Sequence, residues 1–557
     1  MDSIPILSLI AFAPVIGAAV IFFMRGIAQE QARAVALIAT AASFVLSVLM
    51  ILDLDKNAEF QFREDVEWLT DLGIAYRMGV DGIAAVLIVL TTLIGLVSVI
   101  WSWNAITYRG REYYITLLIL QTGMLGVFMA LDLFIFYIFW ELVLIPMALL
   151  IGIWGSENRV FAATKFFLYT LVGSLLMLVG IVATYQQYYE TTGVRTLNIL
   201  DLQTGWDLGA YSAEFQGVAF AAFLIAFAIK IPMWPFHTWL PDAHVQAPTA
   251  ASVVLAAVML KMGGYGLLRF NLPLFPEASE DWAMIIMAMS LIAILYGALV
   301  ALVQPDFKKL IAYSSVSHMG FVTLGIFTNI FLMTRSDLNG FNGSMMVMVA
   351  HGFNTGGLFL LVGMLYERAH TRRLSAYGGL AGRMPLYAFF LGLFTFASIA
   401  LPGTSGFVGE FLSILGAFQY EKWIAFIAFL VAILSAWYML WMYQQVINGR
   451  PYGQLPDPHD ASLTAAEKAE LAAAGSGGHG HGHDLAHAPV SGGAHDHPED
   501  GQLDSTNWHD LNTRELISLL PLAALTLVLG IYPDIVFNIV EPSFARIMDP
   551  FMRGPLN

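Results

Sequence analysis

The chain has 557 residues, of which 58% are hydrophobic and 12% are charged, and its mean hydropathy is +0.70. This composition indicates a polytopic membrane protein and excludes a soluble globule. The formal net charge of −15 gives no reason to expect nucleic acid as a partner. The absence of cysteine excludes disulfides, thiolate zinc sites and cysteine-ligated iron–sulfur clusters in this chain.

Fourteen apolar runs, bounded by charges or turn residues, predict an all-α protein with about 14 transmembrane helices. The first run has no basic segment before it and no cleavage site, so we expect a retained helix rather than a signal peptide. The runs cover residues 4–24, 34–52, 80–104, 113–130, 132–153, 160–186, 215–238, 248–270, 282–303, 309–333, 344–366, 384–414, 423–447 and 514–540.

Lys and Arg are unevenly divided between alternate loops. One set of loops carries 15 of the 26 basic residues and the other carries nine, while Lys230 and Lys261 fall inside apolar runs. The positive-inside rule places the richer set in the cytoplasm. We therefore expect a multi-pass protein of the bacterial cytoplasmic (inner) membrane with both termini on the periplasmic side.

Three connecting segments have a distinct character. Alternating apolar residues at 58–79 predict an external β-hairpin, for contact with a neighbouring subunit or as a frayed loop. The cytoplasmic segment 449–513 holds eight of the 13 histidines in a Gly, Ser and Ala context, which fits a flexible linker better than a weak metal site. The tail after residue 541 is expected to lie along the external surface. The histidines considered as metal ligands are His479, His481, His483, His487, His495 and His497, and the apolar tail residues are Phe544, Ile547, Phe551 and Met552.

Lys230 is the feature around which the functional prediction is built. It is the sole charge between Glu214 and Asp242, within an apolar run long enough to cross a bilayer. An ionisable side chain at such a position indicates a functional site. Pro232 and Pro235 follow directly and must break the helix beside the lysine, as in ion-handling membrane proteins.

Three further charges are predicted inside the bilayer. Glu141 lies near the middle of its run, Lys261 lies 13 residues past a proline, and Glu410 follows a second interruption around Pro402. The pKa of an amine falls on desolvation and rises beside a carboxylate. Movement of Glu141 relative to Lys230 would therefore load or unload a proton, with Lys261 as the next base; a static Glu141–Lys230 pair is the structural alternative.

Five other polar residues are candidates for the same pathway. His318 and His351 lie among small and hydroxyl residues, and the sequence leaves a proton relay and a satisfied core histidine equally open. His237, Asp242 and His244 flank the broken helix and form a candidate cytoplasmic inlet, although interfacial packing of the neighbouring aromatic residues explains that loop almost as well.

The two proline breaks lie five helices apart, which predicts two inverted five-helix repeats. The resulting division of the chain has five parts: 1–104 with three transmembrane helices and the hairpin, 113–270 as the first repeat, 282–447 as the second, 449–513 as the linker, and 514–557 as the last helix and tail.

A family resemblance is carried by six segments: FIFYIFWELVLIPMALLIGIWG, KFFLYTLVGSLLML, KIPMWPFHTWLPDAHVQAPTAASVVLAAVMLKMGGYGLLRF, LVQPDFKKLIAYSSVSHMGFV, LYERAHTRRLSAYGGLAGRMP and ASIALPGTSGFVGEF. They resemble the chain M subunits of bacterial NADH:quinone oxidoreductase (complex I), equivalent to mitochondrial NADH dehydrogenase subunit 4, within an antiporter-like family. The resemblance covers nearly all fourteen helices. The His-rich insertion at 475–497 departs from the short connection usual in the family.

The resemblance implies a proton-pumping translocase subunit of the membrane arm. NADH oxidation and quinone reduction would occur in other membrane-arm and peripheral-arm subunits, which carry FMN, iron–sulfur clusters and quinone, with no redox centre, cofactor or metal in this chain. The family's relay residues fall on Glu141, Lys230, Lys261, His318, His351 and Glu410.

Alternative functions remain. A subunit of a multi-chain sodium/proton antiporter or membrane-bound hydrogenase is the nearest, and co-purification with flavin and iron–sulfur subunits distinguishes it. A haem protein with His318 and His351 as axial ligands predicts a coloured chain. A passive scaffold predicts that neutralising the four buried charges leaves pumping intact.

Overall fold

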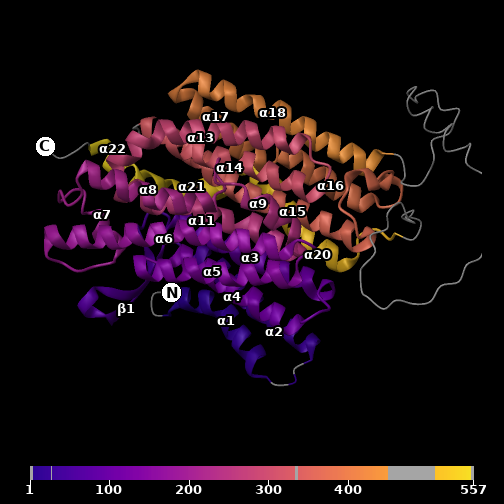
Figure 1. Cartoon of the computed structure of the whole chain (residues 1–557), viewed down its shortest axis with the longest axis horizontal. Helices are drawn as coiled ribbons and strands as arrows, with labels where there is room; N and C mark the ends of the chain where they lie inside the picture. The colour runs from indigo at the N-terminus through magenta and orange to yellow at the C-terminus, as the bar shows by residue number, and fades with distance from the viewer. Residues whose placement is uncertain (1–3, 25, 27, 333–336, 450–507, 554–557) are drawn as a thin grey trace, which may run out of the picture.

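The computed structural model describes residues 4–24, 26, 28–332, 337–449 and 508–553, which form a helical bundle with one small β-hairpin (Figure 1). The first half contains α1 (Ile6–Phe23), α2 (Gln29–Leu52), β1 (Gln61–Leu69), η1 (Thr70–Leu72), β2 (Ile74–Val80), α3 (Gly82–Ala105), α4 (Gly110–Met129), α5 (Leu133–Trp154), α6 (Arg159–Thr192), α7 (Ile199–Gln203), α8 (Ala213–Lys230), α9 (Trp239–Gln246), α10 (Thr249–Val254), η2 (Leu255–Met259), α11 (Leu260–Gly266), η3 (Leu267–Asn271) and α12 (Leu272–Leu274). The second half contains α13 (Pro276–Leu302), α14 (Phe307–Leu332), α15 (Asn339–Ala369), η4 (Leu374–Ala376), η5 (Leu380–Gly382), α16 (Pro385–Ser398), α17 (Ser405–Tyr420), α18 (Lys422–Tyr443), η6 (Gln444–Asn448), α20 (Thr513–Ile531), α21 (Asp534–Ile547) and α22 (Asp549–Arg553).

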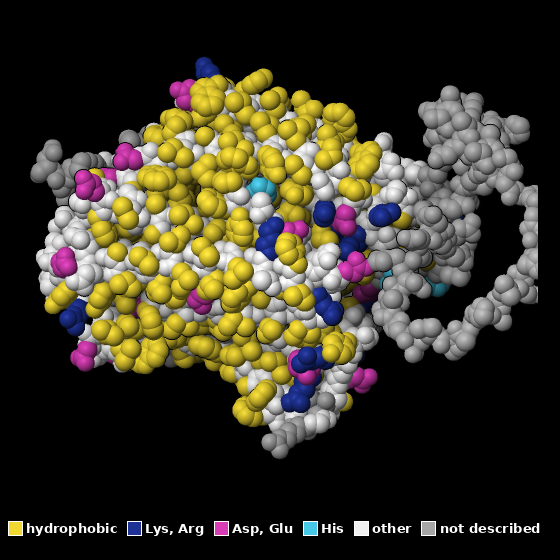
Figure 2. Space-filling model, in the orientation of Figure 1, with side chains coloured by type: hydrophobic (Ala, Val, Ile, Leu, Met, Phe, Trp, Pro, Cys, Tyr) yellow, Lys and Arg dark blue, Asp and Glu magenta, His cyan; other side chains and the backbone are white. Residues whose placement is uncertain are grey.

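The predicted all-α, polytopic class is confirmed. Within the described residues, 13 helical segments are long and apolar enough to cross a membrane, and the remaining predicted run is divided between α16 and α17. Hydrophobic side chains cover most of the face shown in Figure 2, and charged side chains gather mainly at its left edge and over its right half. The two inverted repeats and the five-part division of the chain stay predictions.

The interior of the bundle is built from α14, α15 and the continuous helix that runs from α10 to α12. Residues 250–274 and 340–365 are wholly buried, and α14 nearly so. In Figure 1 the chain proceeds from α1 and α2 at one edge to α17 and α18 at the other, and α20 returns to contact α3, α15 and α17. Most side chains on these three interior helices are therefore shielded from lipid.

The first break follows the prolines, as predicted. Helix α8 ends at Lys230, and α9 begins only at Trp239. Proline cannot donate a backbone hydrogen bond, so carbonyls at the end of α8 need other partners. Trp239 Nε1 donates to the Ile229 carbonyl at 2.9 Å, and the Met233 amide donates to Ala228 at 2.8 Å. The end of α8 is thus embedded in protein, whereas Pro235 and Thr238 in the connection to α9 are exposed.

The second break separates α16 from α17 near Pro402. Gly403 has a φ of +92°, a conformation open to glycine but costly for other residues. Asp510, far away in the sequence, accepts hydrogen bonds from the Leu386 and Tyr387 amides in the first turn of α16, at 2.8 and 3.0 Å. A carboxylate there complements the positive end of the helix dipole and fixes the start of α16.

The C-terminal prediction is wrong in two respects. The run 514–540 is not one helix, because Pro533 lies at a bend between α20 and α21. The apolar residues of the tail also do not face outward: Phe544, Ile547 and Phe551 are buried, and Phe544 stacks on Phe341 at 5.1 Å. Burial of this apolar face against α3 and α15 outweighs the attraction of an interfacial position.

The hairpin is antiparallel and pairs β1 with β2. Glu64 accepts hydrogen bonds from the Leu7 and Ser8 amides in α1, at 2.8 and 3.1 Å. Arg77 forms an ion pair of 3.1 Å with Asp132, the residue that caps the N-terminus of α5. The hairpin is therefore anchored to this chain and is not a frayed loop, while its contact with a neighbouring subunit stays a prediction. The histidines of the 449–513 linker at positions 479–497 lie outside the described residues.

Candidate functional site

The four predicted membrane charges come from four helices. Glu141 is the ninth residue of α5, Lys230 is the last residue of α8, Lys261 lies in α11, and Glu410 lies in α17. Lys230 and Lys261 are 2% and 0% exposed, and Glu410 is 6% exposed. Each charge therefore needs partners within the protein, because an isolated ion is costly to bury.

Lys230 lies against aromatic faces beside Glu141. Its Nζ is 5.1 Å from the ring centroid of Trp140 and 6.0 Å from that of Phe166. The Glu141 carboxylate interacts electrostatically with Lys230, but no ion pair within 4.0 Å joins these two described residues. Glu141 Oε1 is buried without a hydrogen-bond partner. The arrangement is a loose charge pair, and whether it is static stays open.

Lys261 is paired with His351 across the interior of the bundle. Its Nζ lies 2.8 Å from His351 Nδ1 and also donates to the Ala256 carbonyl. The two residues are 90 positions apart in the sequence, on α11 and α15. The sequence offered no partner for Lys261, and the structure supplies one.

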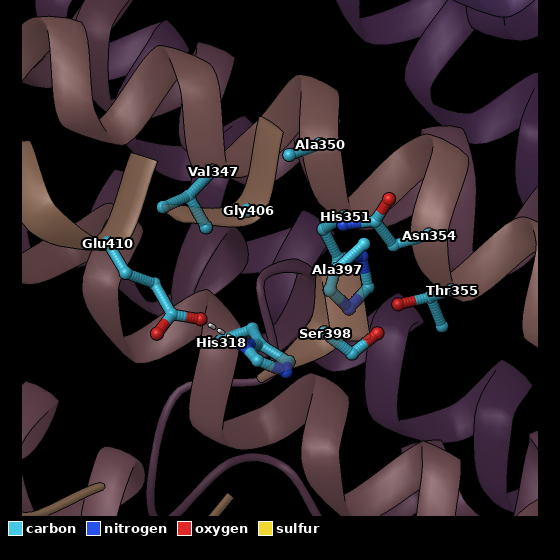
Figure 3. Close-up of a pocket in the computed structure, with 10 residues that line it drawn as sticks. All are labelled: His318, Val347, Ala350, His351, Asn354, Thr355, Ala397, Ser398, Gly406 and Glu410. Carbon is cyan, nitrogen blue, oxygen red and sulfur yellow. Dashed lines mark hydrogen bonds and ion pairs between the residues drawn. The ribbon is translucent and has the colours of Figure 1, made fainter. Parts of the chain in front are cut away.

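Glu410 is paired with the second histidine. His318 Nδ1 lies 2.7 Å from Glu410 Oε1 (Figure 3), and the rings of His318 and His351 have centroids 5.9 Å apart. Lys261, His351, His318 and Glu410 therefore form one row of neighbouring ionisable groups. This geometry favours the relay interpretation of both histidines over simple core packing.

A small cavity lies beside this row. It has a volume of about 20 Å³ for water centres, which is room for about one water. Figure 3 shows the two histidines and Glu410 among its lining residues, together with Asn354, Thr355 and Ser398. His318 Nε2 and His351 Nε2 are buried without partners. A haem does not fit between the histidines in so small a space, which argues against the haem alternative.

Asn354 was missed by the sequence reasoning. Its Oδ1 accepts a hydrogen bond of 2.8 Å from Thr526 Oγ1 in α20. The available signal was its spacing, because a residue three positions after His351 lies on the same face of a helix. A polar residue on a buried helical face beside a candidate histidine was reason to include it.

The helices bearing Lys230 and Lys261 are in close contact. A Cβ on Gly263 would lie 2.7 Å from the Phe227 carbonyl and 2.8 Å from the Ile231 amide. Only glycine allows this approach of α11 to the end of α8. Within the described residues no hydrogen bond connects Lys230 to Lys261, so transfer between them requires water or side-chain movement.

The three candidate inlet residues are not brought together. Asp242 forms an ion pair of 2.7 Å with Lys165. His237 is buried, with Tyr296 at 5.0 Å between ring centroids. His244 is fully buried and stacks on Phe359 at 4.5 Å. Of the three, His244 lies deepest, within electrostatic range of Lys261 and His351.

Two buried cations were assigned to loops by the sequence reasoning. Arg269 is 5% exposed and forms an ion pair of 2.6 Å with Asp81, the N-cap of α3. Lys308 is 4% exposed, in the first turn of α14. Both occur at the boundary of an apolar run, where sequence hydropathy does not distinguish a buried helix end from a loop. Among the described residues, no group of three or more His, Asp or Glu side chains is placed to hold a metal ion.

Comparison with known proteins agrees with this geometry. The sequence model of the family described as NADH:quinone oxidoreductase/Mrp antiporter, TM matches residues 130–435. The NADH-quinone oxidoreductase subunit M of Rhodobacter capsulatus is 44% identical, over 98% of this chain and 97% of that relative. The NADH-ubiquinone oxidoreductase chain 4 of Chondrus crispus is 38% identical, over 98% of this chain and 97% of that relative.

A solved structure matches over the same length. One chain of the respiratory complex I from Thermus thermophilus with bound NADH has a TM-score of 0.77 and 29% identity, and the match covers 98% of this chain and 100% of that chain. The chain therefore belongs to the NADH:quinone oxidoreductase/Mrp antiporter family of membrane subunits, among its subunit M and chain 4 members.

Proposed function

We propose that this chain is the proton-translocating, antiporter-like subunit of the membrane arm of an NADH:quinone oxidoreductase. NADH oxidation and quinone reduction take place in partner subunits, which hold FMN, iron–sulfur clusters and quinone. The relatives are named as complex I subunits over nearly the whole chain, which favours this function over a sodium/proton antiporter or hydrogenase subunit. The distribution of basic residues supports a bacterial inner-membrane location with periplasmic termini.

The observation that carries the proposal is the row of ionisable groups at the centre of the bundle. Lys261 contacts His351, the His351 and His318 rings are neighbours, and His318 contacts Glu410. Lysine, histidine and carboxylate can each gain or lose a proton, and each one's affinity depends on its neighbour's charge. A static scaffold has no need of four titratable groups in a row, because apolar packing stabilises buried positions as well or better.

The proposed path begins at the cytoplasmic end near α9. A proton is held at Lys230 under the control of Glu141, passes to Lys261 and along the two histidines, and leaves near Glu410. The small cavity beside the histidines and Glu410 has room for about one water and supports transfer across the gap between the rings. The loose Glu141–Lys230 contact supports a pair that changes its separation during turnover.

Replacement of Lys261 tests the proposal in the assembled complex. We expect Lys261→Ala to retain NADH oxidation by an artificial electron acceptor, which reports on the assembled peripheral arm. Coupled quinone reduction and proton pumping in membrane vesicles should fall sharply, because the row then lacks its first base. The matched control is Lys422→Ala, which removes an exposed lysine at the start of α18. A normal proton-to-electron ratio in assembled Lys261→Ala complex would overturn the proposal.

A further inference from the structure

Lys308 is a buried lysine that the proposed path does not use. Its Nζ donates to the Ala247 carbonyl at 2.7 Å and lies 3.5 Å from Ser252 Oγ. It occupies the first turn of α14, where the positive end of the helix dipole disfavours a cation. The dipole of its own helix therefore gives no reason for a lysine at this position.

His244 lies close by with both ring nitrogens unsatisfied. Nδ1 and Nε2 are buried and without hydrogen-bond partners in the described part of the chain. Leaving a buried polar atom unpaired costs about 1–3 kcal/mol, so two such atoms on one ring call for a compensating role. Stacking on Phe359, with an interplanar angle of 14°, fixes the plane of the ring.

His244 connects Lys308 to the central row. The charges of Lys308 and Lys261 both act on the His244 ring, and His244 in turn interacts electrostatically with His351. Ser252 lies next to both Lys308 and His244, because its hydroxyl donates to the main-chain carbonyl of His244 at 3.1 Å and is 3.5 Å from Lys308 Nζ. The His244 ring is thus within electrostatic range of both buried lysines.

A purely structural role for Lys308 has a specific form. Arg372 donates to the Val245 carbonyl, and Lys308 donates to Ala247, so both cations bind carbonyls at the C-terminal end of α9. Arg372 is also paired with Asp306 at 3.6 Å. Capping carbonyls requires only a fixed positive charge with N–H donors, which arginine supplies as well as lysine.

We propose that Lys308 and His244 form an inlet that delivers protons to Lys261 without passing through Lys230. One proton moves from the Lys308 ammonium to a free ring nitrogen of His244 and then to the neutral amine of Lys261, directly or through one water. Lys308 is reprotonated by water at the end of α9. This inlet rests on the proposed function, because Lys261 must be a proton carrier for the delivery to matter.

The decisive experiment compares two substitutions of Lys308 in the assembled complex. Lys308→Arg keeps the charge and the donors but cannot release a proton at cellular pH, whereas Lys308→Met removes both. We expect both variants to lower coupled turnover by at least about tenfold. This threshold is set conservatively, because a positioned acid–base group contributes about 10²–10⁴-fold. Lys309→Arg, on the adjacent and more exposed lysine, serves as the control and should be normal.

Each other outcome overturns the inlet. Normal turnover in Lys308→Arg with a loss in Lys308→Met would assign Lys308 to capping of α9, and normal turnover in both would leave it without a role. If Lys308→Arg does not assemble, His244→Phe decides: it retains the stacked ring, and full turnover would refute the proposal. The Lys261→Ala variant separates the two proposals. If only the inlet is wrong, Lys261→Ala still loses proton pumping; if the proposed function is wrong, Lys261→Ala pumps normally.

Discussion

The separation of Glu141 and Lys230 sets an upper limit on the interaction energy between their charges. Because no ion pair within 4.0 Å joins these described residues, their interaction is weaker than that of a contact pair. At an effective dielectric constant of about 20, two charges about 4 Å apart interact by about 4 kcal/mol. The coupling should therefore lie below about 4 kcal/mol, or below about a thousandfold in rate. Glu141→Gln and Lys230→Met remove one charge each with little change in side-chain size.

A double-mutant cycle measures this energy directly. Each single variant should slow NADH-driven proton pumping in membrane vesicles, and the double variant should be no slower than the slower single. The control is Glu190→Gln, which removes an exposed carboxylate at the end of α6. The reasoning would be refuted if the two effects multiplied in the double variant, because the residues would then act independently. Normal pumping in Glu141→Gln would refute it equally.

Two further predictions concern α16, the helix that precedes the second break. Asp510→Ala removes the acceptor at the N-terminus of α16 and should cost about 1–3 kcal/mol; the complex should lose activity faster on heating, with an unchanged proton-to-electron ratio. Gly406→Ala places a Cβ 2.1 Å from the Ala397 carbonyl, so α16 and α17 must separate at a cost of about 1–3 kcal/mol and the amount of assembled complex should fall. The control is Gly217→Ala, whose Cβ would have nothing within 4 Å and which should leave that amount unchanged.

Hydropathy and proline placement were sufficient to predict most of the fold. The break after Lys230 follows from the geometry of Pro232 and Pro235, which does not depend on packing. Pro533 likewise indicates a helix break, but the apolar residues on both sides of it suggested one continuous membrane-spanning helix. The buried tail at Phe544 was also unpredictable from the sequence, because its burial depends on a surface formed by α3 and α15.

The identity of the buried charges was predictable, but their partners were not. Lys261 meets His351 across 90 residues and His318 meets Glu410 across 92, so each contact depends on how distant helices pack. No local rule connects such positions. Lys308 shows a different failure: a lysine at the end of an apolar run looks the same in sequence whether it faces water or lies 4% exposed inside the bundle.

The two histidine contacts constrain how protons occupy the central row. A hydrogen bond between Lys261 Nζ and His351 Nδ1 requires one of these nitrogens to act as acceptor, so the contact accommodates a single shared proton. The same holds for His318 Nδ1 and Glu410 Oε1, where the carboxylate is the natural acceptor. In the proposed relay each pair would hold one proton, and the unpartnered Nε2 atoms of the two rings would be free to exchange it. The ring centroids are 5.9 Å apart, and in the proposed relay a water in the small cavity beside them would carry the proton across.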